Sequence, residues 1–286
     1  MPAQTIRYHW LYRDFLAVAH TASPVDWTER VWQNYVGRHE ALLNQLYFRP
    51  KGVLDPRGRL TALGPSRFNA LLTQVGDPTA FEEDIRTLWA DVLARLHYHG
   101  PDYEVFVVVG LDVTNVYSLT MDGQPVTVLC LESVDADRAG LQRLIAHESH
   151  HWTRQSALGR DLTSVVGERM VSEGLAAVFS KEIQPGLSPA AYCYVDAGTV
   201  AWVVQHRHLL QQWVPLLDSG GLMDRLFSRT YDGPELIPDM PRRTGYVYGY
   251  FACRAALDRD GCRLSAVDWV HMPWQAVLSL DGGVPK

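Results

Sequence analysis

The sequence predicts an α+β fold. Runs of residues typical of β-strands are confined to one stretch, Glu104 to Glu132. Helical patterns fill most of the chain before and after that stretch. Strands that are grouped together, with helices grouped on either side, are typical of α+β proteins rather than of a βαβ alternation. The chain contains no internal repeat and no low-complexity segment.

Residues 1–100 carry mainly helical patterns. Apolar residues recur at three-and-four spacing in Asp26–Phe48 and in Pro78–His99, as expected for two amphipathic helices. Pro50–Pro65 between them is rich in Gly and Pro, and we predict a turn there with a short hairpin. We therefore expect a helical N-terminal region, residues 1–100, packed on a second domain formed by residues 101–286.

The second domain begins with three predicted strands and continues with five predicted helices. Runs of β-branched residues indicate strands, and Met121-Asp122-Gly123-Gln124 predicts a hairpin turn between the last two. The predicted strands are Val105–Val109, Val116–Thr120 and Val126–Leu131. The predicted helices are Asp137–Leu158, Thr163–Ile183, Ala197–Leu217, Tyr246–Arg259 and Ser265–Leu280, the last broken by Pro273.

Composition excludes several classes of protein. With 286 residues, 47% of them hydrophobic, the chain is long enough to bury a substantial core. The net charge of -6 and the lack of a basic stripe argue against a nucleic-acid partner. We find neither a secretory signal nor an apolar run long enough to span a membrane. The four cysteines are far apart in the sequence, and we expect them to be buried, reduced thiols. We expect a soluble, cytoplasmic protein.

The residues with the clearest chemistry lie in the first predicted helix after the strands. His147-Glu148-x-x-His151 is an HExxH motif, and three of the 11 histidines fall within five residues here. Two imidazoles four residues apart share one helical face, where they suit two corners of a zinc tetrahedron. Glu148 is turned away from them and suits a general base, whereas His150 points off the ligand face.

A catalytic zinc ion usually takes a third protein ligand. In the next predicted helix, Glu173 lies on the apolar face with Val166 and Met170, where an unpaired carboxylate is rare. Glu168 is the alternative, on a more polar face. Gly174 directly after Glu173 indicates that another backbone or a substrate comes close.

The motif and the downstream Glu173-Gly174-Leu175-Ala176 together resemble the gluzincin branch of the zinc metallopeptidases, and most closely bacterial families of predicted zinc-dependent proteases. The Gly245–Tyr250 segment adds to this similarity over roughly residues 104–260. The resemblance implies a zincin-like catalytic domain in residues 101–286, with a substrate-aligning edge strand within Val105–Leu131. The chain differs from thermolysin-like enzymes at Ala177. Those enzymes have an Asp at this position, which orients the first histidine of the motif.

The resulting hypothesis is a zinc metallopeptidase that hydrolyses peptide bonds of a peptide or protein substrate. His147, His151 and Glu173 would bind Zn²⁺, Glu148 would act as the general base, and Tyr246 would stabilise the oxyanion, with Tyr250 as the alternative. Two other classes stay open: a non-catalytic zinc- and peptide-binding regulatory module of the same fold, and a non-peptidase zinc hydrolase. Retention of Glu148 argues against the first. The sequence indicates neither cleavage specificity nor oligomeric state.

Overall fold

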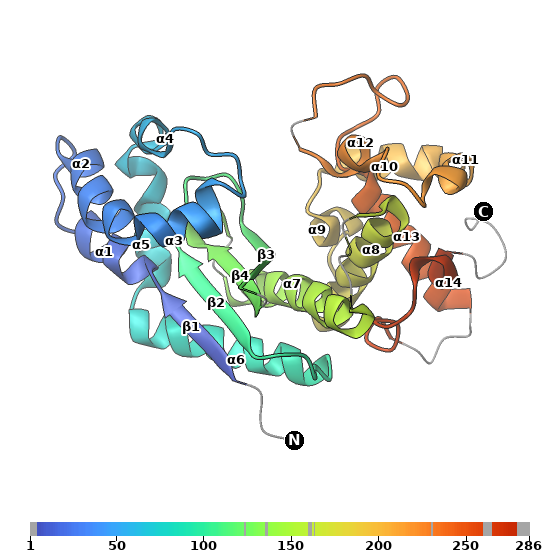
Figure 1. The fold of residues 1–286 in the computed structure, drawn as a ribbon, viewed down its shortest axis with the longest axis horizontal. Coiled ribbons are helices and arrows are strands. Elements are labelled where there is room, and N and C mark those ends of the chain that lie inside the picture. The colour runs from blue at the N-terminus through green and yellow to red at the C-terminus, as the bar shows by residue number, and fades with distance from the viewer. Residues whose placement is uncertain are drawn as a thin grey trace. The chain divides into compact units, whose positions relative to one another are not determined.

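The computed structural model describes residues 5–122, 124–134, 137–159, 162, 164–229, 231–259 and 265–278 (Figure 1). The chain forms two compact units that interleave along the sequence. Within the described residues, unit 1 comprises residues 5–90 and 101–141, and unit 2 comprises residues 91–100 and 142–278. The division at residue 100 that the sequence suggests stays a prediction.

Unit 1 contains a mixed sheet of four strands in the order β1-β2-β4-β3 (Figure 1). The strands are β1 (Ile6–Trp10), β2 (Tyr103–Val108), β3 (Val116–Met121) and β4 (Gln124–Cys130). β2 lies parallel to both β1 and β4, whereas β3 pairs antiparallel with β4 at an edge. The three predicted strands and the α+β class are confirmed, although Gly123 of the predicted turn lies outside the described residues.

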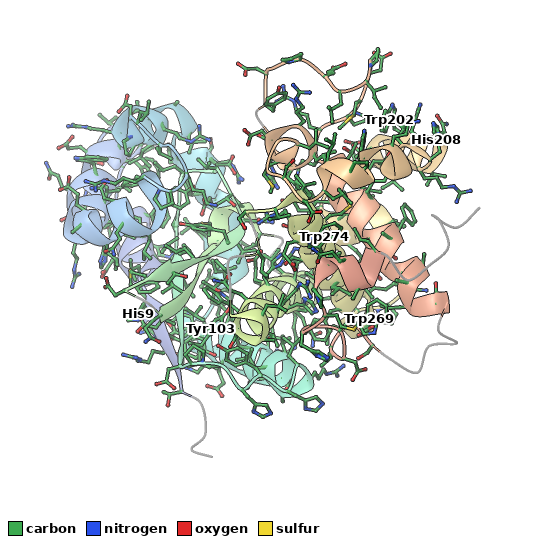
Figure 2. All side chains as sticks on the ribbon, turned by 45° about the vertical axis from the view of Figure 1, so that its right-hand side comes forward. His9, Tyr103, Trp202, His208, Trp269 and Trp274 are labelled. Carbon is green, nitrogen blue, oxygen red and sulfur yellow. The ribbon has the colours of Figure 1, made fainter. Side chains whose placement is uncertain are left out.

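The strand β1 is missing from the sequence-based prediction, which treats this part of the chain as helical. Its parallel pairing joins residues almost 100 positions apart, such as Tyr8 and Val105. Tyr103, the first residue of β2, is buried and shares a hydrogen bond with Thr127 of β4, and His9 of β1 stacks on the ring of Phe106 (Figure 2). A five-residue strand without a hairpin partner leaves only a weak local signal.

Apart from α6, the helices of unit 1 are short, and several are irregular. The predicted helix Asp26–Phe48 is divided by π-helical and 3₁₀ turns, and the hairpin predicted in Pro50–Pro65 is wrong. A helix, α4, forms there because Pro56 occupies its first turn and the Asp55 side chain caps it by accepting the Gly58 N–H. The helices are α1 (Tyr12–Ala19), α2 (Trp27–Val31), α3 (Glu40–Leu43), α4 (Pro56–Leu63), α5 (Asn69–Val75) and α6 (Pro78–Arg95), whose end belongs to unit 2.

The loop that follows β2 is held by a charged cluster in unit 1. Arg67 binds both carboxylate oxygens of Asp112, at 3.0 and 2.7 Å, and also donates to the carbonyl of Glu132. Asp112 has a left-handed backbone, with φ of 56°. The paired guanidinium of Arg67 lowers the pKa of the Asp112 carboxyl below its ordinary value.

Unit 2 is helical. Its helices are α7 (Arg138–Leu158, beginning in unit 1), α8 (Val166–Ile183), α9 (Pro189–Cys193), α10 (Ala197–His206), α11 (Leu209–Trp213), α12 (Met223–Phe227), α13 (Thr244–Arg259) and α14 (Trp274–Leu278). The predicted helices around α7, α8 and α13 are confirmed. The predicted helix Ala197–Leu217 breaks after His206, and the predicted terminal helix is helical only from Trp274, with its last two residues outside the described part of the chain.

The two longest helices after the motif helix, α8 and α13, pack with their backbones in close approach (Figure 1). A Cβ atom added at Gly174 would lie 2.3 Å from the carbonyl oxygen of Gly249, and one at Gly249 would lie 2.2 Å from that of Met170. The close approach predicted at Gly174 is therefore made by a helix backbone. At the start of α8, Gly167 leaves room for the ring of Trp274 from α14 (Figure 2).

Cys130, Cys193 and Cys253 are buried free thiols, as predicted, and Cys262 lies outside the described residues. Within the described part of the chain, no helix is long and apolar enough to cross a membrane.

Candidate metal centre

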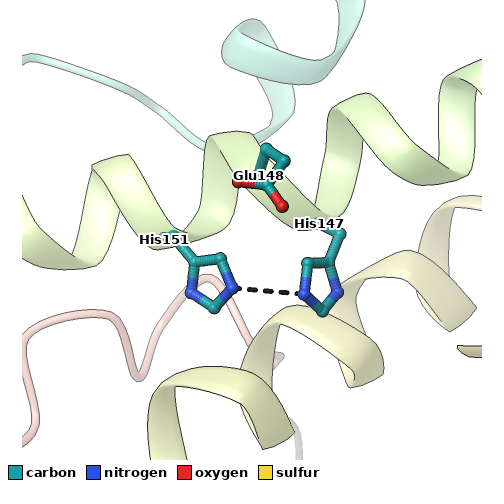
Figure 3. Close-up of side chains that lie close together, drawn as sticks. All are labelled: His147, Glu148 and His151. Carbon is teal, nitrogen blue, oxygen red and sulfur yellow. Dashed lines mark hydrogen bonds between the residues drawn. The ribbon is translucent and has the colours of Figure 1, made fainter. Parts of the chain in front are cut away.

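Helix α7 presents the motif residues on adjacent turns (Figure 3). The Nε2 atoms of His147 and His151 are 3.1 Å apart, and their ring centroids are separated by 4.8 Å. His147 is buried and His151 is half-buried. The spacing predicted from the sequence is therefore realised as two imidazoles whose Nε2 atoms face each other.

Helix α8 brings Glu173 to the same point. Its Oε2 atom lies 3.1 Å from Nε2 of His147 and 3.3 Å from Nε2 of His151, and the carboxylate is buried. The alternative ligand, Glu168, is buried elsewhere in an ion pair with Arg154. The three donor atoms of His147, His151 and Glu173 thus form a nearly equilateral triangle that excludes Glu168.

This triangle fits a tetrahedral zinc ion. Ligands that bind Zn²⁺ at about 2.0–2.1 Å lie about 3.3 Å from one another at the corners of a tetrahedron. Two imidazole nitrogens and a carboxylate oxygen also form a typical donor set of catalytic zinc sites. Without a cation, the three atoms can be held together only by protons on the Nε2 atoms, whereas a cation would satisfy the lone pairs of all three at once.

The neighbours of the histidines influence which ring nitrogen carries the proton. Oγ of Ser172 lies 2.8 Å from Nδ1 of His151 and can accept its N–H. In that tautomer, Nε2 of His151 presents its lone pair to the triangle. Nδ1 of His147 is buried and has no hydrogen-bond partner among the described residues. Ser172 therefore supports the second histidine of the motif, whereas the first has no such support among the described residues.

Arg169 supports the third corner. It lies one helical turn before Glu173, and its guanidinium is 2.6 Å from Oε1 of Glu173, the oxygen that does not face the histidines. Burial acts to raise the pKa of Glu173, but the charge of Arg169, followed by interactions with the two histidines, outweighs it and holds the pKa well below its ordinary value. Glu173 is consequently an anion. The i, i+4 spacing of Arg169 and Glu173 is the sequence signal that could have predicted this pair.

Glu148 lies beside the triangle. One of its carboxylate oxygens is within 4.8 Å of a ring nitrogen of both His147 and His151, and the side chain is half-buried (Figure 3). Glu148 therefore lies on the same side of α7 as the two imidazoles and close to both.

The two candidate tyrosines occupy different surroundings. The hydroxyl of Tyr246 accepts a hydrogen bond of 3.4 Å from Arg169, which connects it to Glu173. Tyr250 instead stacks on Tyr192 and lines a separate cavity of about 340 Å³ between α10 and α13. His150 is buried away from the triangle, where Nε2 contacts the carbonyl oxygen of Ala266 and burial holds the pKa well below its ordinary value.

Tyr194 is a neighbour of the site that the sequence did not predict. Its ring stands edge-on to that of His147, with centroids 5.5 Å apart, and its backbone is left-handed with φ of 52°. Arg243 donates to its carbonyl oxygen. No local pattern marks Tyr194, because it follows a five-residue helix and reaches the site only through the packing of α9.

The fold and the three donor atoms define a candidate metalloprotein of the α+β class. Residues 101–279 match the model of the family described as Predicted Zn-dependent protease (DUF2268), and the chain belongs to this family. No curated protein and no solved structure matches the chain. The family description and the group formed by His147, Glu148 and His151, which could hold a metal ion, both indicate zinc.

Proposed function

We propose that this chain is a zinc-dependent peptidase with a zincin-like catalytic domain in residues 101–286. The observation that carries the proposal is the triangle of His147, His151 and Glu173, with Glu148 beside it. The family assignment supports a protease, and its match begins at residue 101. An antiparallel edge strand, β3, precedes the motif helix in the chain, as it does in a zincin-like arrangement.

The three corner residues would hold the zinc ion. Zinc bound there would lower the pKa of a coordinated water to about 7 and polarise the scissile carbonyl. Ser172 would orient His151, and Arg169 would orient Glu173 through the oxygen that does not face the histidines. This support would keep the donor atoms in place without rearrangement during the reaction.

Glu148 would serve as the general base. Its carboxylate would take a proton from the attacking water and then pass it to the nitrogen of the leaving amine. Because it lies outside the triangle, Glu148 would be able to move a proton while His147, His151 and Glu173 stay fixed.

Tyr246 would stabilise the oxyanion. Its oxygen accepts the hydrogen bond from Arg169, so its own hydroxyl hydrogen can be donated to the carbonyl oxygen on which negative charge develops. Tyr250 would not take this role, because it lines the separate cavity beside α10.

The proposal is tested with the Glu148→Gln variant of the full chain. Zinc content is measured by mass spectrometry and hydrolysis by the release of peptides from a denatured protein. We expect wild-type zinc content and a loss of hydrolysis of at least about 100-fold. Glu182→Gln, in α8 and away from the triangle, is the matched control and should keep activity. Hydrolysis that survives Glu148→Gln contradicts the mechanism, and zinc binding by a wild-type chain without hydrolysis favours the regulatory module.

A further inference from the structure

Two arginines lie against the two tyrosines near the candidate metal centre. The guanidinium of Arg243 lies over the ring of Tyr246, 4.2 Å from its centroid, and donates to the carbonyl oxygen of Tyr194. Arg143 lies 5.9 Å from the ring centroid of Tyr194, and Arg229 is near enough for its charge to be repelled by that of Arg243. These residues all belong to unit 2, as do the proposed zinc ligands.

Arg243 is connected to the proposed ligands by two short series of contacts. In the first, Glu173 pairs with Arg169, which bonds to the Tyr246 hydroxyl, and Arg243 covers the Tyr246 ring. In the second, His147 packs against Tyr194, whose carbonyl oxygen accepts the Arg243 bond. Arg243 is thus separated from His147 by Tyr194 alone, and from Glu173 by Arg169 and Tyr246, so it lies close to the proposed metal ligands.

The positive charge at this point is not neutralised by the protein. In the part of the chain that the structure describes, none of Arg143, Arg229 and Arg243 has a carboxylate within 4.0 Å, whereas Arg169 pairs with Glu173. Desolvation, and after it the repulsion from Arg243, lowers the pKa of Arg229 below its ordinary value. Arg243, which lies on Tyr246 and Tyr194 without a carboxylate partner among these described residues, is therefore suited to bind an anion, and its guanidinium fork matches a carboxylate well.

We propose that Arg243, aided by the positive charge of Arg229, binds a carboxylate of the peptide substrate, so that peptides with an anionic group near the scissile bond are favoured. This inference rests on the proposed peptidase function. The carboxylate comes either from the free C-terminus of the peptide or from an acidic side chain, and both offer the same two oxygens to the guanidiniums.

The test measures binding rather than turnover, with the zinc-loaded Glu148→Gln chain and isothermal calorimetry. The first pair of probes is the peptide Ala-Ala-Phe-Ala with a free C-terminal carboxylate and with a C-terminal amide. The second pair is two amidated peptides that end in Glu and in Gln. We expect the acid to bind at least about tenfold more tightly than its neutral partner in at least one pair.

The arginine variants decide whether this preference belongs to the proposed residues. Arg243→Gln and Arg229→Gln should each reduce the preference for the acid to nearly onefold. Arg254→Gln is the matched control, because Arg254 lies in α13 and pairs with Asp258. Arg229 is exposed, so Arg229→Gln keeps the test valid if loss of the Arg243 bond to Tyr194 unfolds the protein.

A preference in the first pair alone identifies a C-terminal carboxylate, and a preference in the second pair alone identifies an acidic side chain; both support the proposal. Equal binding of acid and neutral peptides in both pairs overturns it, as does a preference that survives both arginine substitutions. Repeating the titrations with the metal-free chain separates this inference from the proposed function. A preference that depends on Arg243 there establishes the anion site even if the wild-type chain hydrolyses no peptide.

Discussion

The guanidinium of Arg169 lies 2.6 Å from Oε1 of Glu173, whose other oxygen faces the two motif histidines. The pair is formed within one turn of α8, so the helix itself fixes the orientation of the carboxylate. Glu173 thereby combines the roles of a buried anion and of the third corner of the donor triangle.

Replacing Arg169 should weaken zinc binding. Loss of a group that orients a metal ligand typically costs 10–100-fold in affinity, and we expect Arg169→Gln to reduce zinc affinity by at least about tenfold. Arg169→Lys, which keeps the charge, should recover part of this loss. Competition with a chromogenic chelator measures both variants. Unchanged affinity in Arg169→Gln would show that Glu173 needs no such support.

Ser172 should support His151 in the same way. Ser172→Ala removes the hydroxyl 2.8 Å from Nδ1, and we expect zinc affinity to fall about tenfold. Ser180→Ala is the control in the same helix, because that hydroxyl contacts the carbonyl oxygens of Ala176 and Arg143. If both variants bind zinc equally well in the chelator competition, Ser172 has no part in the metal site.

The close approach of α8 and α13 should be intolerant of a methyl group. In Gly249→Ala the new Cβ would lie 2.2 Å from the Met170 carbonyl oxygen, so one backbone must shift. We expect a loss of about 1–3 kcal/mol in the free energy of unfolding. Gly221→Ala, where the nearest atom to an added Cβ is 3.6 Å away, should cost much less. Urea unfolding compares the two, and equal stability would contradict this packing.

The Arg67–Asp112 pair gives a pH-dependent contribution to stability. Because Arg67 lowers the pKa of Asp112 in the folded state, the contribution is present above the unfolded pKa of about 3.9 and is lost as the pH falls through the folded value. Both side chains are about one-third exposed, so we expect only about 0.5 kcal/mol. The stability difference between wild type and Asp112→Asn, measured in urea, should shrink as the pH falls from about 6 to about 3. A difference independent of pH would show that the pair contributes no charge interaction.

Much of this site is predictable because its central residues obey helical spacing. His147 and His151 are one turn apart, and Glu173 is conspicuous as a carboxylate on an apolar helical face. Gly174 likewise indicates a close approach, which the backbone of α13 makes at Gly249. These features depend on local periodicity, which a single sequence records.

The missed features depend on contacts between distant segments. β1 exists because it pairs with β2 almost 100 residues later, and Tyr194 reaches His147 only through the packing of α9. The hairpin expected in Pro50–Pro65 failed for a local reason, since Pro and Asp also begin helices and Asp55 caps α4. The same residues that interrupt one type of element can therefore start another.

X-ray absorption at the zinc edge tests the central claim most directly. The wild-type chain loaded with zinc should bind about one ion, with only nitrogen and oxygen ligands at about 2.0–2.2 Å and the scattering of two imidazoles. Glu173→Ala should lose one oxygen ligand or fail to retain the ion. A sulfur ligand at about 2.3 Å, or a spectrum unchanged by both His147→Ala and Glu173→Ala, would contradict a metal centre at His147, His151 and Glu173.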